Sequence, residues 1–124
     1  MYVREATVSD LPDAMNVLDG AALSIDVETV RAGIADDGTL VAVSENGERV
    51  LGAVVLDGEH IVAVAVRRRR RGQGIGTALV EAAADRRERL TADFDADVRP
   101  FYEGLGFDIE RADEAGRWRG ERDS

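Results

Sequence analysis

The sequence predicts a mixed α/β fold, a sandwich in which helices cover both faces of a mostly antiparallel sheet. Residues 39–66 hold three strand-like segments separated only by short turn signals, which is typical of an antiparallel meander. The last of these, Ile61–Val66, is apolar on both faces, as expected for a central strand with helices above and below. With 124 residues, of which 44% are hydrophobic, the chain is expected to form one domain over residues 1–124.

The first third of the chain is predicted to hold one strand and two helices. Tyr2–Ala6 forms the strand. Thr7 and Asp10 have the spacing of a capping box at the start of the first helix, and an early proline leaves Ser9 as an alternative cap. Val27–Ala35 is predicted as a second short helix because its apolar residues fall on one face.

The middle of the chain is predicted to be a three-stranded meander. The strand Thr39–Ser44 is followed by Asn46-Gly47, a strong two-residue hairpin signal, and by the partner strand Arg49–Leu56. Asp57-Gly58 makes a second tight turn into the third strand, His60–Val66.

The last part of the chain is predicted to alternate helices and strands. Gly76–Leu90 reads as the long helix, with Leu90 on its buried stripe, and Thr91–Phe94 as a short strand. A brief helix covers Asp97–Leu105, and Gly106 is suited to a left-handed stop. A final hairpin has the strands Phe107–Arg111 and Arg117–Arg119.

The composition excludes several kinds of site. The chain has no cysteine, which rules out disulfides, thiolate zinc sites and a cysteine nucleophile. Its one histidine, His60, rules out a multi-histidine metal site, and no loop has carboxylate ligand spacing, so no metal is expected. No apolar run can span a bilayer, and the N-terminus lacks the apolar core of a signal peptide. We therefore expect a soluble, cytoplasmic protein without a membrane partner.

The charge balance has two interpretations, a solvated acidic surface that favours solubility and, as the preferred one, adaptation to concentrated salt. All 16 basic residues are arginines, and they stand against 25 acidic residues, for a net charge of -9. A surface without lysine and rich in carboxylates is common in salt-adapted proteins, so a halophilic, archaeal source is expected. At about 1 M salt the screening length is about 3 Å, so recognition must rest on contact geometry. The negative net charge argues against nucleic-acid binding.

The most informative segment is the glycine loop Arg71–Gly76, which follows the central strand and precedes a helix. Its glycines let the backbone approach a ligand, and the helix start adds unpaired amides, so the loop suits a phosphate or pyrophosphate. A Walker loop needs a lysine, and the dinucleotide fingerprint needs a glycine where the chain has Thr77. A third pattern, Arg/Gln-x-x-Gly-x-Gly/Ala, is matched fully by Arg71, Gly74 and Gly76.

With these residues, the sequence resembles the GNAT superfamily of acetyltransferases. Arg4–Leu11 is similar to the opening of the family, Val66–Leu79 to its cofactor motif and Phe101–Phe107 to its C-terminal signature. The three segments occur in the family's order and cover almost the whole chain. The resemblance implies a GNAT-like fold, in which the strand before the loop splays from its neighbour and acetyl-CoA lies in the gap.

The resemblance also assigns the donor site residue by residue. Pantetheine would pair with the strand around Val64 to Val66, and the pyrophosphate would lie on the amides from Gly72 to Thr77. The implied cofactor-binding residues are Val64, Ala65, Val66, Arg71, Gly72, Gln73, Gly74, Ile75, Gly76 and Thr77.

Catalytic candidates are few. By the resemblance, the phenol of Tyr102 lies near the cofactor sulfur and protonates the leaving thiolate. His60 lies eleven positions before Arg71, where one branch of the family has a glutamate base, and an imidazole can accept a proton near neutral pH. A surface histidine and a water chain remain alternatives. The backbone N–H of Val66 is the predicted polariser of the acetyl carbonyl.

The arginine run Arg67–Arg70, just before the motif, has three interpretations. It can pair with cofactor phosphates, including the ribose phosphate, or remain solvated and paired with surface carboxylates. A nucleic-acid patch is a third interpretation, which the absence of interleaved aromatic residues disfavours.

The predicted function is transfer of an acetyl group from acetyl-CoA to a primary amine, and the alternative is a non-catalytic, regulatory acyl-CoA-binding module. The acceptor depends on the first two helices, the loop from Gly20 to Asp26 and the hairpin around Trp118, none of which carries a motif. Small amines, polyamines, amino acids, antibiotics and protein N-termini or lysines stay open as acceptors. The oligomeric state is also undecided, and a homodimer is one alternative, since dimers are common in the family.

Overall fold

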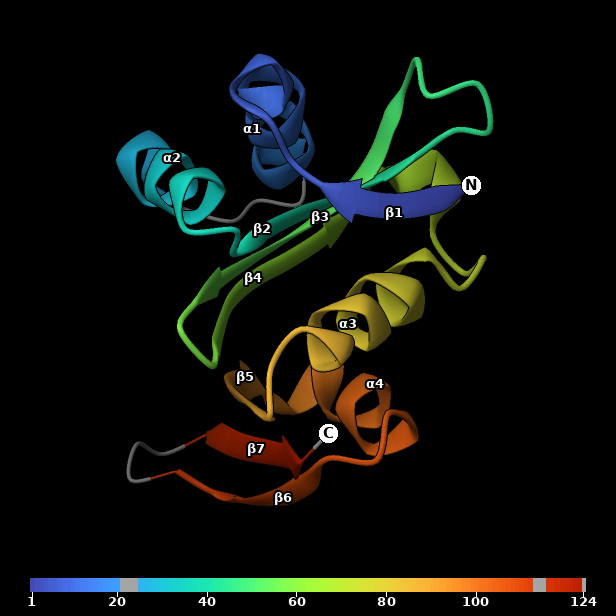
Figure 1. Ribbon diagram of the computed structural model, residues 1–124. Coiled ribbons are helices and arrows are strands. Elements are labelled where there is room, and N and C mark those ends of the chain that lie inside the picture. Colours follow the sequence, from blue (N-terminus) through green and yellow to red (C-terminus); the bar gives the residue numbers. More distant parts are fainter. Residues whose placement is uncertain (21–24, 113–115, 124) are drawn as a thin grey trace.

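The computed structural model describes residues 1–20, 25–112 and 116–123 and contains one seven-stranded sheet (Figure 1). The strand order is β1-β2-β3-β4-β5-β7-β6, and every neighbouring pair is antiparallel except the parallel pair β4–β5. The strands are β1 Tyr2–Glu5, β2 Thr39–Val43, β3 Val50–Asp57, β4 His60–Val66, β5 Arg89–Asp95, β6 Asp108–Arg111 and β7 Arg117–Asp123. The predicted mixed α/β fold class is confirmed.

Helices cover both faces of this sheet. α1 (Leu11–Gly20) and α2 (Val27–Ala35) lie on one face, and α3 (Ile75–Asp85) lies on the other (Figure 1). α4 (Arg99–Gly104) lies on the side of α3, against the strands of the C-terminal part. Three short 3-10 turns are η1 Val8–Asp10, η2 Arg68–Arg70 and η3 Ala96–Val98. None of the helices among the described residues has the apolar length that crossing a bilayer requires.

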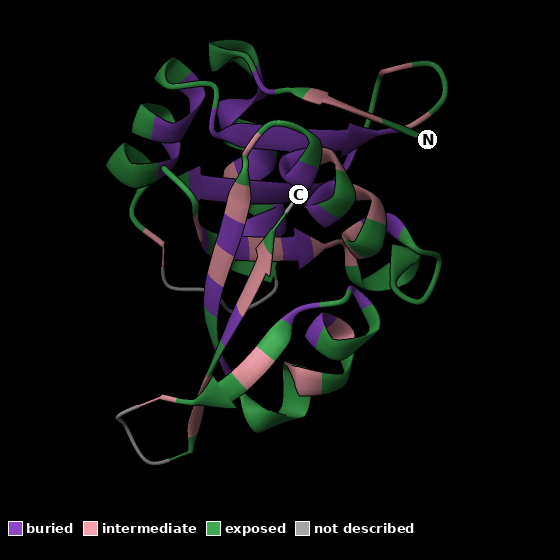
Figure 2. Ribbon diagram, turned by 60° about the horizontal axis from the view of Figure 1, so that its bottom comes forward, coloured by how far each residue is buried: buried purple, intermediate pink, exposed green. Residues whose placement is uncertain are grey.

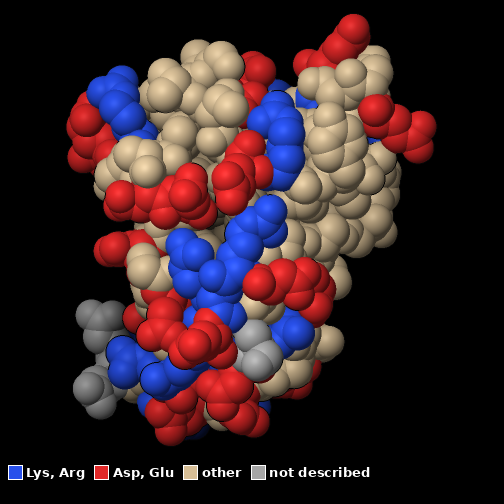
Figure 3. Space-filling model, in the orientation of Figure 1, with Lys and Arg blue, Asp and Glu red and all other residues tan. Residues whose placement is uncertain are grey.

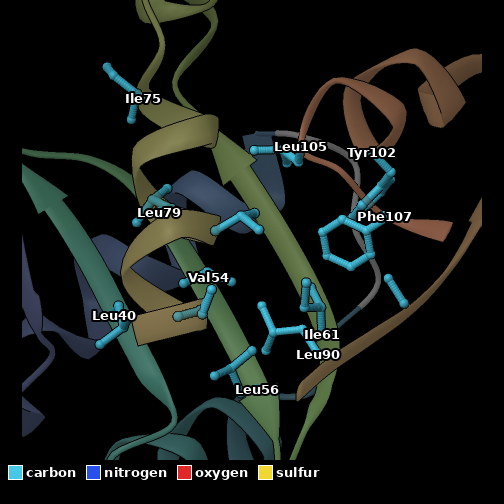
Figure 4. Close-up of a cluster of buried hydrophobic side chains, with 14 of the residues drawn as sticks. Leu40, Val54, Leu56, Ile61, Ile75, Leu79, Leu90, Tyr102, Leu105 and Phe107 are labelled. Carbon is cyan, nitrogen blue, oxygen red and sulfur yellow. The ribbon is translucent and has the colours of Figure 1, made fainter. Parts of the chain in front are cut away.

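The sheet separates two hydrophobic clusters. Under α1 and α2, Leu18 and Val30 are fully buried and pack with Val55 of β3. On the opposite face, Leu79 of α3 and Leu90 of β5 belong to a larger cluster that also takes in α4 (Figure 4). β2, β3 and β4 contribute to both clusters, and β2 and β3 are buried along almost their whole length. Figure 2 shows the buried residues gathered between the helices of the two faces.

The turn into α1 is held by Asp10, as the capping box predicts. Its carboxylate accepts hydrogen bonds from the Thr7 amide at 2.7 Å and from both terminal nitrogens of Arg4, at 2.7 and 3.0 Å. These bonds, led by that from Arg4, lower the pKa of Asp10 to about 2. The capped turn is the 3-10 segment η1, and the α-helix begins at Leu11.

Several sequence-based boundaries are wrong. The last strand runs from Arg117 to Asp123 instead of ending at Arg119, because it pairs along the whole of β5, and the predicted helix 97–105 is divided into η3 and α4. The long helix ends at Asp85 instead of Leu90, because residues from Arg89 onward pair with β7, and this pairing outweighs helical spacing. The connection from β2 to β3 spans residues 44–49 instead of a two-residue turn, although Gly47 does adopt a positive φ of 76°. In α2, Val27 is 38% exposed instead of lying on the buried face.

Candidate functional site

The strands β4 and β5 pair only at their first residues. His60 is opposite Thr91 and Ile61 is opposite Ala92, and no further pair joins the two strands. A register shift between β3 and β4 leaves Val62 without a partner directly after these pairs. From this point β4 and β5 diverge and enclose a cavity of about 640 Å³, which we call the β4–β5 cleft.

The walls of the cleft come from four parts of the chain. They are Ile61, Val62, Ala63, Val64, Ala65 and Val66 of β4, Arg71 and Gly76 of the glycine loop and α3, Asp93, Phe94 and Asp95 of β5, and Asp97, Val98, Phe101, Tyr102 and Arg117. Val62 and Val98 are 40% and 41% exposed, although both are apolar. Exposed apolar side chains inside a concave site are typical of a ligand-binding surface.

The hydrogen-bonding groups of β4 face the cleft at alternate residues. Arg67 donates its amide to the Leu51 carbonyl at 2.8 Å, so β4 directs its odd-numbered residues toward β3 in this region. Val64 and Val66 therefore direct their backbone N–H and C=O groups toward β5, which does not pair with them. These groups are available to an extended ligand, apart from the Val66 carbonyl, which accepts a bond from Arg71 Nε at 3.2 Å.

The glycine loop presents a run of free amides next to the cleft. Gly72 and Gly74 have φ values of 77° and 81°, which favour glycine. Among the described residues, no hydrogen bond is formed by the amides of residues 72–77, and the first paired amide is that of Ala78, which donates to Gly74 at 3.0 Å. Six unpaired N–H groups at the start of an eleven-residue helix suit an anion.

Gly76 serves a different purpose, which is close packing. A Cβ atom at this position would lie 3.3 Å from the Phe101 ring, so α3 and α4 approach each other closely beside the cleft. Of the predicted cofactor residues, Val64, Ala65, Val66, Arg71 and Gly76 line the cleft, whereas Gly72, Gln73, Gly74, Ile75 and Thr77 lie on the adjoining loop and helix turn. The Ile75 side chain belongs to the core, so only its backbone can serve a ligand.

Tyr102 lies on α4 with its side chain in the cleft wall. Its ring stacks on Phe94 with centroids 4.3 Å apart and meets Phe107 edge-on at 5.1 Å (Figure 4). The phenol forms no hydrogen bond with any described residue, yet its oxygen is not sealed from solvent, so it opens into the cleft. Burial raises the pKa of Tyr102 to about 12, which keeps the phenol protonated and able to donate at neutral pH.

His60 lies at the closed end of the cleft. Its Nδ1 is 2.9 Å from the Thr91 hydroxyl, the cross-strand neighbour, and the side chain is half-buried. It is not among the residues that line the cleft. The structure thus brings Tyr102 together with the open part of β4, and it holds His60 at the opposite end of the strand.

The sequence analysis missed the charged pairs on the β5 wall. Asp95 pairs with Arg117 at 2.8 Å and Asp93 with Arg119 at 3.0 Å, in each case between residues directly opposite on β5 and β7. The sequence does carry a signal, since aspartates and arginines recur two residues apart in the two segments. Recognising it requires the pairing of β5 with β7, which lies more than twenty residues away along the chain.

The arginine run is divided between two cavities. Arg71 lines the β4–β5 cleft, whereas Arg67–Arg70 line a separate cavity of about 480 Å³ on the side of α1. Arg67 is fixed there, because its Nε donates to the Val50 carbonyl at 2.6 Å. This second cavity, which we call the arginine cavity, is lined by Asn16, Val17, Gly20, Arg49, Leu51, Arg67, Arg68, Arg69 and Arg70.

The segments predicted to select the acceptor are only partly described. Residues 21–24 of the loop between α1 and α2 and residues 113–115 of the last hairpin lie outside the described residues. Of the acidic residues there, Asp26 caps α2 by accepting from the Glu28 amide at 3.0 Å. Trp118 lies under the guanidinium of Arg99, 4.3 Å from its ring centroid.

Comparisons with known proteins agree with this geometry. A family model described as an acetyltransferase (GNAT) domain matches residues 16–116, a range that includes the cleft, the glycine loop and α4. No curated protein sequence matches the chain.

Solved structures share the fold along the whole chain. Rv2747 of Mycobacterium tuberculosis, solved in complex with CoA, has a TM-score of 0.79 at 20% identity, with 100% of this chain and 99% of that chain covered. Ard1 of Thermoplasma volcanium has a TM-score of 0.79 at 17% identity, covering 98% and 95%. The ribosomal-protein-alanine N-acetyltransferase of Brucella melitensis has a TM-score of 0.74 at 21% identity, covering 100% of both chains.

Proposed function

The chain belongs to the acetyltransferase (GNAT) domain family, and from this membership we propose that it transfers the acetyl group of acetyl-CoA to a primary amine within a ternary complex. The parallel pair β4–β5, which ends after two residue pairs beside a loop of free amides, is the observation that carries the proposal. A structural neighbour solved with CoA supports the same donor.

The residues at the cleft fit CoA in three respects. The amides of residues 72–77 would hold the diphosphate, since they are unpaired and lie at a helix start. The free backbone N–H and C=O of Val64 would pair with the amides of the pantetheine arm, as an added strand does, and would leave the Val66 N–H for the acetyl group. The apolar side chains of Val62 and Val98 would cover its methylene groups.

Acetyl-CoA supplies an acetyl group activated as a thioester, and the chain must orient the reactants and move two protons. The free N–H of Val66 would polarise the acetyl carbonyl while the amine nitrogen bonds to its carbon and the carbon–sulfur bond breaks. Tyr102 would donate its phenol proton to the departing sulfur and recover a proton from water in the cleft.

The proton of the attacking ammonium requires a separate acceptor. His60 and a water chain are the candidates, and the position of His60 outside the cleft lining favours water. The contact between His60 and Thr91 would then serve to hold the two strands together at the closed end.

Thiol release in the presence of an amine panel tests the proposal. Purified protein should bind CoA and release thiol steadily when acetyl-CoA is supplied with an accepted amine. CoA binding without release from any amine would instead support a regulatory acyl-CoA-binding module. No binding of CoA or acetyl-CoA would contradict both.

The salt-adapted, cytoplasmic setting is also a proposal. It is supported by the net charge of -9 and by the absence of lysine. Acidic and arginine side chains lie next to one another over much of the face seen in Figure 3. If the protein works in concentrated salt, then thiol release and the melting temperature should both rise when KCl is added.

A further inference from the structure

The arginine cavity concentrates positive charge in an acidic protein. Four of its lining residues, Arg67–Arg70, are consecutive, and Arg49 adds a fifth guanidinium from the start of β3. Arg49 and Arg68–Arg70 are exposed. Among the described residues, none of these five arginines forms an ion pair with a carboxylate.

Most arginines elsewhere in the molecule behave differently, although Arg71, Arg87 and Arg111 also form no ion pair with a described carboxylate. Those that pair with described carboxylates are Arg4, Arg31, Arg86, Arg89, Arg99, Arg117, Arg119 and Arg122. Carboxylates outnumber arginines by 25 to 16, so partners are not scarce. Glu45, which lines a neighbouring cavity with Arg70, contacts the N-terminal ammonium at 4.0 Å instead. The fold thus leaves this group of like charges without a protein counter-charge.

The cavity has the size and the walls of a small-molecule site. Its volume of about 480 Å³ falls within the usual range for ligand pockets. Val17 and Leu51, which are 2% and 3% exposed, give it an apolar base, and Asn16 adds a polar amide. No aromatic side chain is among the described residues that line it, so these residues offer no stacking surface of the kind that a nucleic-acid strand would use. Several guanidiniums around one hollow require a compact ligand with concentrated negative charge.

We propose that the arginine cavity binds a small molecule with two or more phosphate groups, while the β4–β5 cleft holds CoA. The two cavities have no lining residue in common. Arg71 faces the cleft and donates a hydrogen bond from Nε to the Val66 carbonyl. Arg67 donates from Nε to the Val50 carbonyl. The proposal of an anion site does not depend on the proposed function. Only the part that concerns simultaneous binding of CoA rests on the proposed function.

Tripolyphosphate is the probe, and its binding is measured by titration calorimetry, once with protein alone and once with protein saturated with CoA. With CoA-saturated protein we expect one site per chain, because CoA then occupies the amides of residues 72–77. Protein alone can bind a second tripolyphosphate on those amides, and the affinity of the arginine cavity should differ by less than about two-fold between the two titrations. Arg68→Gln/Arg69→Gln should weaken binding at least about ten-fold, because hydrogen bonds between charged groups are lost. Arg49→Gln, on a different element, should weaken it in the same direction.

The matched control is Arg31→Gln/Arg111→Gln, which removes the same charge from α2 and β6 and should change the affinity less than about two-fold. Absence of saturable binding would overturn the proposal, and so would an equal loss in the control. Loss, in CoA-saturated protein, of the site that depends on Arg68 and Arg69 would also overturn it, because that loss would assign these arginines to the phosphates of the cofactor. If CoA does not bind at all, the titration of protein alone still tests the anion site, and only the proposed function fails.

Discussion

The two ends of the β4–β5 pair differ in their backbone hydrogen bonding: the strands pair at one end and remain unpaired at the other. At the closed end, His60 and Ile61 face partners on β5, and the Thr91 amide donates to the Glu59 carbonyl at 2.9 Å. At the open end, Val64 and Val66 have no partner on β5, and the space beside them is the cleft. The location of the site therefore follows from where the hydrogen bonding between β4 and β5 stops.

Two glycines repeat this comparison. Gly58 at the closed end has a φ of 60° and Gly74 at the open end has a φ of 81°, and a Cβ atom would meet no neighbour within 4 Å at either position. Their conformational demands are therefore alike. Only Gly74 belongs to the run of unpaired amides, so substitutions at the two positions separate backbone strain from ligand binding.

The largest effect is expected for Gly74→Asp. A carboxylate on this loop would face the diphosphate, and like charges in contact cost several kcal/mol, so CoA affinity should fall by about three orders of magnitude. Titration calorimetry with CoA measures this. Gly58→Asp is the control, since it meets the same left-handed backbone and should leave CoA affinity within about two-fold. Equal losses in both variants would mean that strain, not the loop amides, decides binding.

Tyr102→Phe should lower turnover by about 100-fold, which is typical for loss of a general acid, and leave CoA affinity nearly unchanged. Steady-state thiol release and a CoA titration measure the two quantities. Tyr2→Phe removes a phenol that is 46% exposed and should alter neither. Wild-type turnover in Tyr102→Phe would remove this residue from the mechanism.

Tyr102 should also make the protein sensitive to alkali. Its pKa of about 12 in the folded protein lies above the ordinary value near 10, so the folded state holds the proton more tightly. The stabilisation is complete below about pH 10 and is lost as the pH rises through about 12, by up to about 3 kcal/mol. Urea unfolding across this range measures the loss. Tyr102→Phe should flatten the profile, and a profile that stays unchanged would contradict the assignment.

The smallest effect is expected for His60→Gln. If water carries the ammonium proton, kcat/KM should fall by less than about five-fold, because the residue lies outside the cleft lining. The pH profile of kcat/KM distinguishes the alternatives. A large drop in kcat/KM, together with loss of the acidic limb of the pH profile, would assign the base to His60.

Much of the fold can be predicted from local pattern. The bounds of α2 and β4 follow from periodicity, and the turn at Asp10 follows from capping chemistry. The helix predicted to reach Leu90 fails because residues 86–89 are all charged, and Leu90 alone suits a buried position on a strand as well as on a helix. The pairing of β5 with β7 then decides for the strand.

The residues of the candidate site also fall into two groups, those that can be predicted from local sequence and those that cannot. The glycine loop can be predicted because left-handed backbone and unpaired amides demand particular residues at short spacing. Asp93, Asp95 and Arg117 could not be placed in advance, because they reach the cleft only through pairing between distant segments.

By itself, the sequence determined the fold class, the glycine-loop phosphate motif and the strand that precedes it, since these depend on residues close along the chain. Tertiary structure alone decided that β4 and β5 part after Ile61, that His60 lies at the closed end, and that the arginine run serves two cavities. The physical reason is that a splayed pair of strands is a relation between segments about thirty residues apart, and no local preference encodes where their hydrogen bonding ends.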